Sequence, residues 1–256
     1  MTTATTHPIT FDPSLAEREA QDAVKVWSGA IRAFARKLSP VARAEFFMAL
    51  DSALYEDHGS TAIAAGLHGA LHPKHALTRY HDFFTDNVGR GERVIDLGCG
   101  VGALAISIAG KNLAHVTGMD WSAGNLAKAK AAAAGVEPAL RFVEGDITTT
   151  RLPEAFDVVV LSNVLEHLND RAKLLAQWRE WYKPKRFLIR VPAYDRDWRV
   201  PWKEELNVEW RLDPTHMTEY TWDALASELA TAGLQPIKLT VRWGEYWTVA
   251  VPATDD

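Results

Sequence analysis

The chain has 256 residues, one cysteine and a formal net charge of −5, from 28 basic and 33 acidic residues. A chain of this length forms one large domain, or a domain with an added subdomain, and buries a full core without cross-links. The single cysteine excludes an internal disulfide framework and a cysteine-rich zinc site. The acidic balance argues against a protein that binds nucleic acid by bulk charge, so nucleic acid is not the expected partner.

The sequence has neither a secretory signal pattern at its start nor an apolar run long enough to span a bilayer. Together with the single thiol, this favours a cytoplasmic protein without membrane association.

Residues 1–85 are predicted to form a helical extension ahead of the main domain, which we expect over 86–256. Ser14 and Glu17 have the spacing of a capping box, and an apolar stripe follows them until Pro40 ends the helix. Two further helices are expected, at 46–58 and 74–88. The pattern leaves two roles open for the extension, a cap over a binding site or the interface of a homodimer.

The rest of the chain alternates short apolar strands with helices, which indicates right-handed crossovers and a parallel, doubly wound sheet. We expect these strands at 93–97, 115–120, 141–146, 156–161 and 186–192. Two more, 236–243 and 246–252, are joined by only two residues and must be antiparallel. The predicted fold class is therefore α/β: a doubly wound, mostly parallel seven-stranded sheet with a C-terminal antiparallel hairpin.

A glycine loop follows the first of these strands and opens a helix, at the sheet edge where doubly wound proteins bind ligands. Gly98, Gly100 and Gly102 give the spacing G-x-G-x-G, which differs from the G-x-G-x-x-G of dinucleotide loops. Glycines there let a ligand approach the backbone and the free amides of the helix start. Cys99, within the loop, is expected to be a small loop residue and not a nucleophile.

Acidic residues end three consecutive strands of the predicted sheet. Asp96 suits a ligand with an ammonium group, and Asp120 can accept two hydrogen bonds from a ribose diol. Asp146, which follows Gly145, can accept a hydrogen bond from the exocyclic amine of a purine. The three acids together fit an adenosine with a cationic tail and no phosphate, as in S-adenosylmethionine (SAM).

With these motifs, the stretch from Arg93 to about Pro252 resembles a class I SAM-dependent methyltransferase. It is similar to small-molecule methyltransferases of bacterial polysaccharide and natural-product pathways. The motifs that carry the resemblance are 94–102, 118–120, 144–147 and 156–167. The resemblance implies SAM as cofactor, S-adenosylhomocysteine (SAH) as product, and a Rossmann-like fold.

The resemblance also implies a role for each motif residue. Around the methionine part of SAM it places Asp96, Gly98 and Gly100, and it adds Cys99 and Gly102 to the cofactor-binding residues. Asp120 holds the ribose, Trp121 stacks on the adenine, and Asn163 approaches the sulfonium. The adenine is framed by Gly145, Asp146 and Ile147. Because the helix before the first strand often covers the cofactor in this fold, Arg79 or Tyr80 is expected to meet the methionine carboxylate.

Methyl transfer to an oxygen requires a group that removes the acceptor's proton. His216 is the first candidate, with Asp213 to orient its imidazole, and His167 is the second. Loop packing is the alternative for His216, and a structural or cofactor-shielding role is the alternative for His167. No metal site is expected, since the histidines and acids show no compact metal-ligand spacing.

A long polar segment, 193–220, is expected to form a lid whose aromatic side chains stack on an acceptor ring and whose arginines hold an anionic group. The predicted function is methyl transfer from SAM to a small-molecule or glycan acceptor, through an oxygen. An RNA or protein methyltransferase and a catalytically silent SAM-binding module remain as alternatives. A nucleic-acid methyltransferase that acts on the N6 atom of adenine is not supported, because residues 162–165 are Ser-Asn-Val-Leu and contain no Pro-Pro-aromatic motif.

Overall fold

The computed structural model describes residues 20–64, 73–138 and 140–254. The expected capping box at Ser14 and Glu17 lies outside these residues. Among the described helices, none is both long and apolar enough to cross a bilayer.

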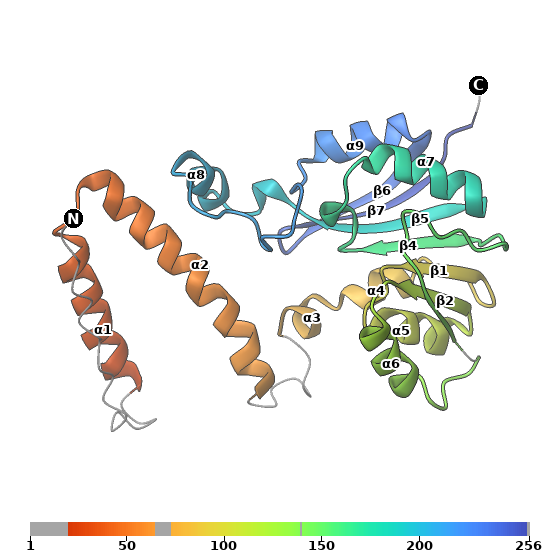
Figure 1. Cartoon of the computed structure of the whole chain (residues 1–256), viewed down its shortest axis with the longest axis horizontal. Helices are drawn as coiled ribbons and strands as arrows, with labels where there is room; N and C mark the ends of the chain where they lie inside the picture. The colour runs from red at the N-terminus through yellow and green to blue at the C-terminus, as the bar shows by residue number, and fades with distance from the viewer. Residues whose placement is uncertain (1–19, 65–72, 139, 255–256) are drawn as a thin grey trace.

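The core of the molecule is one seven-stranded sheet in the order β3-β2-β1-β4-β5-β7-β6 (Figure 1). Its strands are β1 (Arg93–Leu97), β2 (His115–Asp120), β3 (Arg141–Glu144), β4 (Val158–Ser162), β5 (Arg186–Pro192), β6 (Leu234–Arg242) and β7 (Glu245–Pro252). The first five are parallel, and β7 lies antiparallel between β5 and β6. The predicted fold class is confirmed, with the hairpin turn at Trp243 and Gly244.

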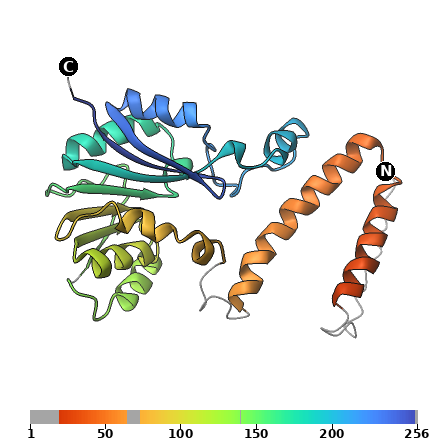
Figure 2. The same ribbon diagram turned by 180° about the vertical axis from the view of Figure 1, so that it is seen from behind.

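Helices cover both faces of this sheet (Figures 1 and 2). One face carries α4 (Tyr80–Thr85), α5 (Ala103–Asn112) and α6 (Ala123–Ala132), and the other carries α7 (Arg171–Tyr182) and α9 (Trp222–Thr231). Strand β1 contributes side chains to the hydrophobic cores on both faces of the sheet. Val94 belongs to the core under α5, and Ile95, which points the opposite way, belongs to the core under α7.

The N-terminal part consists of α1 (Ala20–Ala35), α2 (Pro40–Ala64) and α3 (Pro73–Thr78). Pro40 begins α2, in the first-turn position that tolerates a residue without an amide hydrogen. The single helix predicted over 74–88 is wrong. The chain forms α3 and α4 instead, because Arg79 between them adopts a left-handed conformation (φ 50°) that no α-helix can continue.

The helix α8 (Arg199–Glu205) connects α2 to the α/β domain (Figure 1). Arg199 and Lys203 each lie 2.8 Å from a carboxylate oxygen of Asp51 on α2. Nothing in the periodicity of this polar segment predicted a helix.

A buried ion pair joins the parallel strands to the terminal hairpin. Arg190 of β5 donates to both carboxylate oxygens of Glu245 on β7, at 2.8 and 2.9 Å. Trp247 donates its indole hydrogen to the same carboxylate at 2.9 Å. The Arg190 guanidinium also lies 4.1 Å from the ring centroid of Tyr80, so the pair fixes the start of α4 as well.

We expect Glu245→Gln to lower the free energy of unfolding by about 3–5 kcal/mol, because it leaves the buried Arg190 cation without its counter-charge. Urea denaturation of the two proteins measures this difference. The control is Glu180→Gln, which removes an exposed carboxylate 2.9 Å from Lys183 and should leave the urea midpoint unchanged. Equal losses in both variants would contradict the role assigned to the buried pair.

Candidate active site

The glycine loop between β1 and α5 is shaped by close contacts and positive φ angles. Gly98, Gly100 and Gly102 have φ values of 73°, 54° and 77°. A Cβ atom on Gly98 would lie 2.8 Å from a methyl group of Val164, and one on Gly102 would lie 2.9 Å from Ala129. A Cβ atom on Gly100 would meet nothing within 4 Å. The loop is therefore packed at both ends and open at its middle.

Asp120 at the end of β2 supports this opening. Its carboxylate accepts the Gly100 amide and the Ser122 amide, both at 2.9 Å. Its carbonyl accepts the Gly145 amide at 3.0 Å, which ties the loop after β3 to the same point. The acid predicted to hold a ribose thus also holds two of the loops around the opening.

Asp96, near the end of β1, is 2% exposed, and its Oδ2 atom has no hydrogen-bond partner among the described residues. Burial, together with the nearby Asp120 carboxylate, raises the pKa of Asp96 to about 7. Burial and the same two carboxylates raise the pKa of the Cys99 thiol, which therefore stays protonated at neutral pH. A buried acid without a donor is a place where a bound ligand can supply one.

Arg79 and Tyr80 lie next to each other but have different surroundings. Tyr80 is buried, and burial is the main cause that raises its pKa, with a smaller contribution from Asp96. Arg79 is exposed and pairs with Asp82 at 2.6 Å. Of these two residues, Tyr80 therefore lies close to the opening at Gly100.

The residues predicted to surround an adenine lie at the neighbouring strand ends. Trp121, which directly follows β2, is 80% exposed. Asp146 is exposed and accepts the Thr148 amide at 2.8 Å, and the carbonyl of Ile147 accepts the Trp178 indole hydrogen at 2.9 Å. These contacts hold the loop after β3 on α7 and leave the Trp121 ring free to stack.

Asn163 follows β4 and takes a left-handed conformation (φ 55°). Its amide hydrogen bonds to the Arg190 carbonyl at 2.9 Å, whereas its buried Oδ1 atom has no partner within the described residues. Strain combined with an unsatisfied buried oxygen is typical of a functional position.

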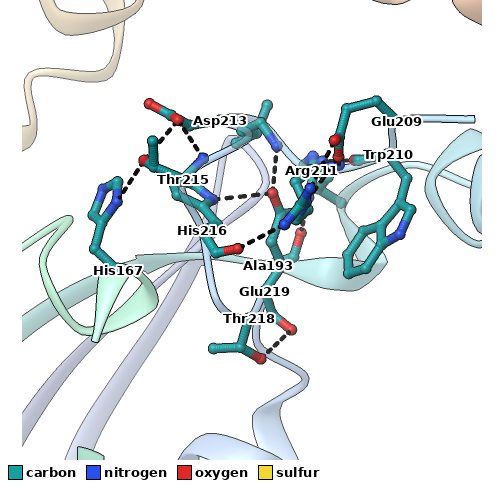
Figure 3. Close-up of polar contacts among 12 residues, drawn as sticks. His167, Ala193, Glu209, Trp210, Arg211, Asp213, Thr215, His216, Thr218 and Glu219 are labelled. Atoms are coloured by element: carbon teal, nitrogen blue, oxygen red, sulfur yellow. Dashed lines mark hydrogen bonds and ion pairs between the residues drawn. The ribbon is translucent and has the colours of Figure 1, made fainter. Parts of the chain in front are cut away.

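Two imidazoles meet beyond the end of β4 (Figure 3). The rings of His167, in the short helix η3 (Leu165–His167), and His216 have their centroids 4.6 Å apart and stand nearly perpendicular. Burial, and then the charge of His167, lowers the pKa of His216 to about 4, so this imidazole is neutral at pH 7. The structure thus brings both predicted proton acceptors together.

Asp213 does not orient His216 as predicted. Its carboxylate accepts the amide and the hydroxyl of Thr215, at 2.8 and 2.7 Å, in the local turn that Asp favours. The Thr215 hydroxyl lies 3.0 Å from Nδ1 of His167, so Asp213 acts on the other imidazole (Figure 3). The partner of His216 is Glu219, whose Oε1 lies 3.2 Å from Nδ1.

Glu166 completes this group, and sequence reasoning did not select it. It is fully buried in η3, and it has a ligand-type oxygen within 4.8 Å of ring nitrogens of both His167 and His216. The Met217 amide donates to the Glu166 carbonyl at 2.7 Å, which fixes the two segments against each other. The only sequence signal was its position directly before His167.

The predicted lid segment 193–220 has its cations already paired. Arg196 pairs with Glu219, and Arg211 pairs with Glu209 at 2.7 Å. Arg199 and Lys203 share Asp51. We expected these arginines to hold an anionic acceptor group, but each arginine of the segment already pairs with a carboxylate of the protein.

A hollow of about 260 Å³ lies between α2, α8 and the hairpin turn. Its aromatic lining is Tyr55, Trp210 and Trp243. An adjoining hollow of about 260 Å³ also touches Tyr55 and Trp243 and reaches Thr78, whose buried hydroxyl has no partner in the described parts of the chain. Both hollows border Gly244 in the hairpin turn, and their aromatic lining suits an organic ring.

Comparisons with known proteins agree with this geometry. Residues 94–185 match the profile of the methyltransferase domain family. The chain is 34% identical over 114 residues to a ubiquinone biosynthesis O-methyltransferase of Aeromonas salmonicida, covering 43% of this chain and 48% of that protein. It is 32% identical over 99 residues to phosphoethanolamine N-methyltransferase 1 of Arabidopsis thaliana, covering 38% of this chain and 20% of that protein. The chain thus spans at most about half the length of these relatives.

Among solved structures, magnesium protoporphyrin IX methyltransferase of Synechocystis PCC 6803, crystallised with bound SAM, aligns with a TM-score of 0.52. The sequence identity is 18%, over 70% of this chain and 79% of that one, so the likeness concerns the fold. The fold defines an α/β protein with a doubly wound sheet, whose glycine loop and acidic residues lie at the ends of β1 to β3. More narrowly, residues 94–185 match the methyltransferase domain family.

Proposed function

We propose that the chain transfers a methyl group from SAM to an oxygen of a small-molecule acceptor and releases SAH. The observation that carries this proposal is the cradle at Gly100, which is open above the backbone and supported by Asp120. Beside it lies the buried Asp96, whose Oδ2 atom has no donor among the described residues. An ammonium group from the methionine part of SAM supplies the donor that Asp96 lacks.

The remaining cofactor contacts follow from the positions of the neighbouring groups. The ribose hydroxyls donate to Asp120, and the adenine lies between Trp121 and the segment of Asp146 and Ile147. Gly98, Cys99, Gly102 and Gly145 hold the backbone shape of these loops. Asn163 presents its free Oδ1 toward the sulfonium side, and Tyr80, in preference to Arg79, closes the methionine side.

The acceptor is proposed to enter from the aromatic hollow next to the segment 193–220. Its tyrosine and tryptophans suit a ring, and the paired state of the cations disfavours recognition of a strongly anionic group. The named relatives act on small molecules, which supports the same acceptor class. A glycan, an RNA or a protein acceptor is a separate outcome of the experiment below.

We assign removal of the acceptor's proton to the imidazole pair of His167 and His216. Methyl transfer is an in-line displacement on an activated donor, so the protein mainly aligns the two reactants and excludes water. A hydroxyl acceptor must also lose a proton, and a neutral imidazole group next to the cofactor serves that step.

Cytoplasmic location and a homodimer formed through α1 and α2 stay predictions.

Asp120→Ala should abolish measurable SAM binding, because it removes the ribose acceptor and the support of the Gly100 amide. Isothermal titration calorimetry with SAM measures the affinity, and circular dichroism checks the fold. Asp86→Ala, which removes an exposed acid paired with Lys111, is the matched control and should bind SAM normally. An unchanged SAM affinity in Asp120→Ala would overturn the assignment of the cradle.

SAM affinity should rise about tenfold from pH 6 to pH 8 and then level off. The sign follows from Asp96, whose pKa is raised to about 7 in the free protein: below this pH the carboxyl is neutral and cannot pair with an ammonium group. Calorimetry across this range measures the effect. In Asp96→Asn the affinity should be weaker and flat with pH, and a wild-type profile without slope would contradict the pairing.

Methyl-labelled SAM incubated with cell extract, fractionated into small molecules, glycans, RNA and proteins, identifies the acceptor class. Label in the small-molecule fraction supports the proposal, and label in another fraction replaces the acceptor class. With the acceptor in hand, His216→Ala should lower turnover by about 10²–10⁴-fold with little change in SAM affinity. His115→Ala, at an exposed histidine of β2, is the control and should turn over normally.

A further inference from the structure

We propose that Glu166, His167 and His216 bind one divalent transition-metal ion, such as Zn²⁺, Mn²⁺ or Fe²⁺. One ligand atom of each residue lies within 4.8 Å of the ligand atoms of the other two, so small side-chain movements bring all three around one ion. Two imidazole nitrogens and one carboxylate oxygen form a donor set that suits these metals better than Mg²⁺ or Ca²⁺. The expectation of no metal site is thereby revised.

The outer contacts of both imidazoles match those of metal-bound histidines, which bind with one nitrogen and use the other for a hydrogen bond. Nδ1 of His167 lies 3.0 Å from the Thr215 hydroxyl, which in turn donates to Asp213. Nδ1 of His216 lies 3.2 Å from Glu219. Both Nδ1 atoms are thus engaged, which leaves Nε2 of each ring for the ion (Figure 3).

The three ligands are held on two segments that are bonded to each other. Glu166 and His167 belong to η3, and the amides of Met217 and Thr218 donate to the Glu166 carbonyl at 2.7 and 3.3 Å. His216 therefore cannot move away from η3 without breaking these bonds. Three protein ligands leave coordination positions for a water molecule or a substrate oxygen, as in catalytic metal sites.

The site lies on the acceptor side of the cradle. Val164, directly before η3, packs on Gly98, where an added Cβ would come within 2.8 Å of its methyl group. Arg211, which lines the aromatic hollow, donates to the His216 carbonyl at 3.0 Å. An ion at this position is adjacent to both the cofactor loop and the proposed acceptor space.

The role in proton removal that we give to the ion rests on the proposed function. The inference that the three residues bind an ion does not rest on it. A divalent ion lowers the pKa of a hydroxyl that it binds. The acceptor hydroxyl then loses its proton to solvent, its oxygen forms a bond to the methyl carbon, and the carbon–sulfur bond breaks with its electron pair left on sulfur. With the ion bound, the imidazole pair promotes proton loss as ion ligands, in place of the direct acceptance of the proton by an imidazole described under the proposed function.

The test uses the full chain, freed of metal with a chelator and titrated with Co²⁺ as the probe. Wild type should bind one equivalent, with visible absorption bands from nitrogen and oxygen ligation, and Zn²⁺ should displace it. Glu166→Gln and His216→Ala should each weaken Co²⁺ binding at least 100-fold. The matched control, His115→Ala, should titrate like wild type, because this exposed histidine lies outside the cluster.

Thr215→Val keeps the test decisive if the buried variants fail to fold. This exposed position holds His167 without being a ligand, so the variant should fold and lose about 10–100-fold in Co²⁺ affinity. Folded wild type that shows no ligand-field bands, or variants that all bind as wild type does, would overturn the inference.

SAM calorimetry on the same samples separates this inference from the proposed function. If the protein binds SAM but no ion, the metal site is overturned and the SAM cradle still stands. If the protein binds the ion but not SAM, the proposed function is overturned and the metal site still stands. Where both bind, label transfer that stops on chelation and returns with the added ion supports the role in proton removal, and transfer that continues in chelator overturns it.

Discussion

The buried pair of Arg190 and Glu245 is the constraint on which the site depends. It attaches the antiparallel hairpin to the last parallel strand, and its guanidinium lies over Tyr80 at the start of α4. The Arg190 carbonyl also accepts the amide of Asn163, in the segment that leads into η3. A pair this buried contributes little net stability but is costly to break, so it holds these elements in one arrangement.

The site consists of two halves with different chemistry. The half at the ends of β1 to β3 presents carboxylates and open backbone, which suits a cationic adenosine compound. The half formed by η3 and the segment 193–220 presents two imidazoles and the carboxylate of Glu166. The halves meet where Val164 packs closely against Gly98, so that contact fixes how the two halves lie against each other.

The sequence predicted the sheet well because its strands depend on local patterns, and the glycine loop and the acids lie at the strand ends where those patterns place them. The strands, the glycine spacing and the acids at the strand ends all fall within short stretches. Sequence did not reveal the groups that are brought together by distant parts of the chain. Glu166 comes near His216 only because η3 and the segment 193–220 meet in the fold. Glu219, three positions after His216, is a local partner that the spacing did not single out. The break at Arg79 precedes Tyr80, whose ring lies under the Arg190 guanidinium. The raised pKa of Asp96 likewise depends on burial, which no spacing rule measures.

The distribution of satisfied and unsatisfied polar groups gives the same picture of the substrate. In the segment 193–220 the cations Arg196, Arg199, Lys203 and Arg211 each have a carboxylate partner, so a further anion would have to displace one. Around the cradle, by contrast, Asp96 and Asn163 keep buried oxygens that have no donor among the described residues. Since a buried acceptor without a donor is costly, these two positions favour a ligand that brings positive charge or hydrogen-bond donors. The proposed function therefore places the positive charge on the cofactor and has the acceptor recognised by its ring and its hydroxyl.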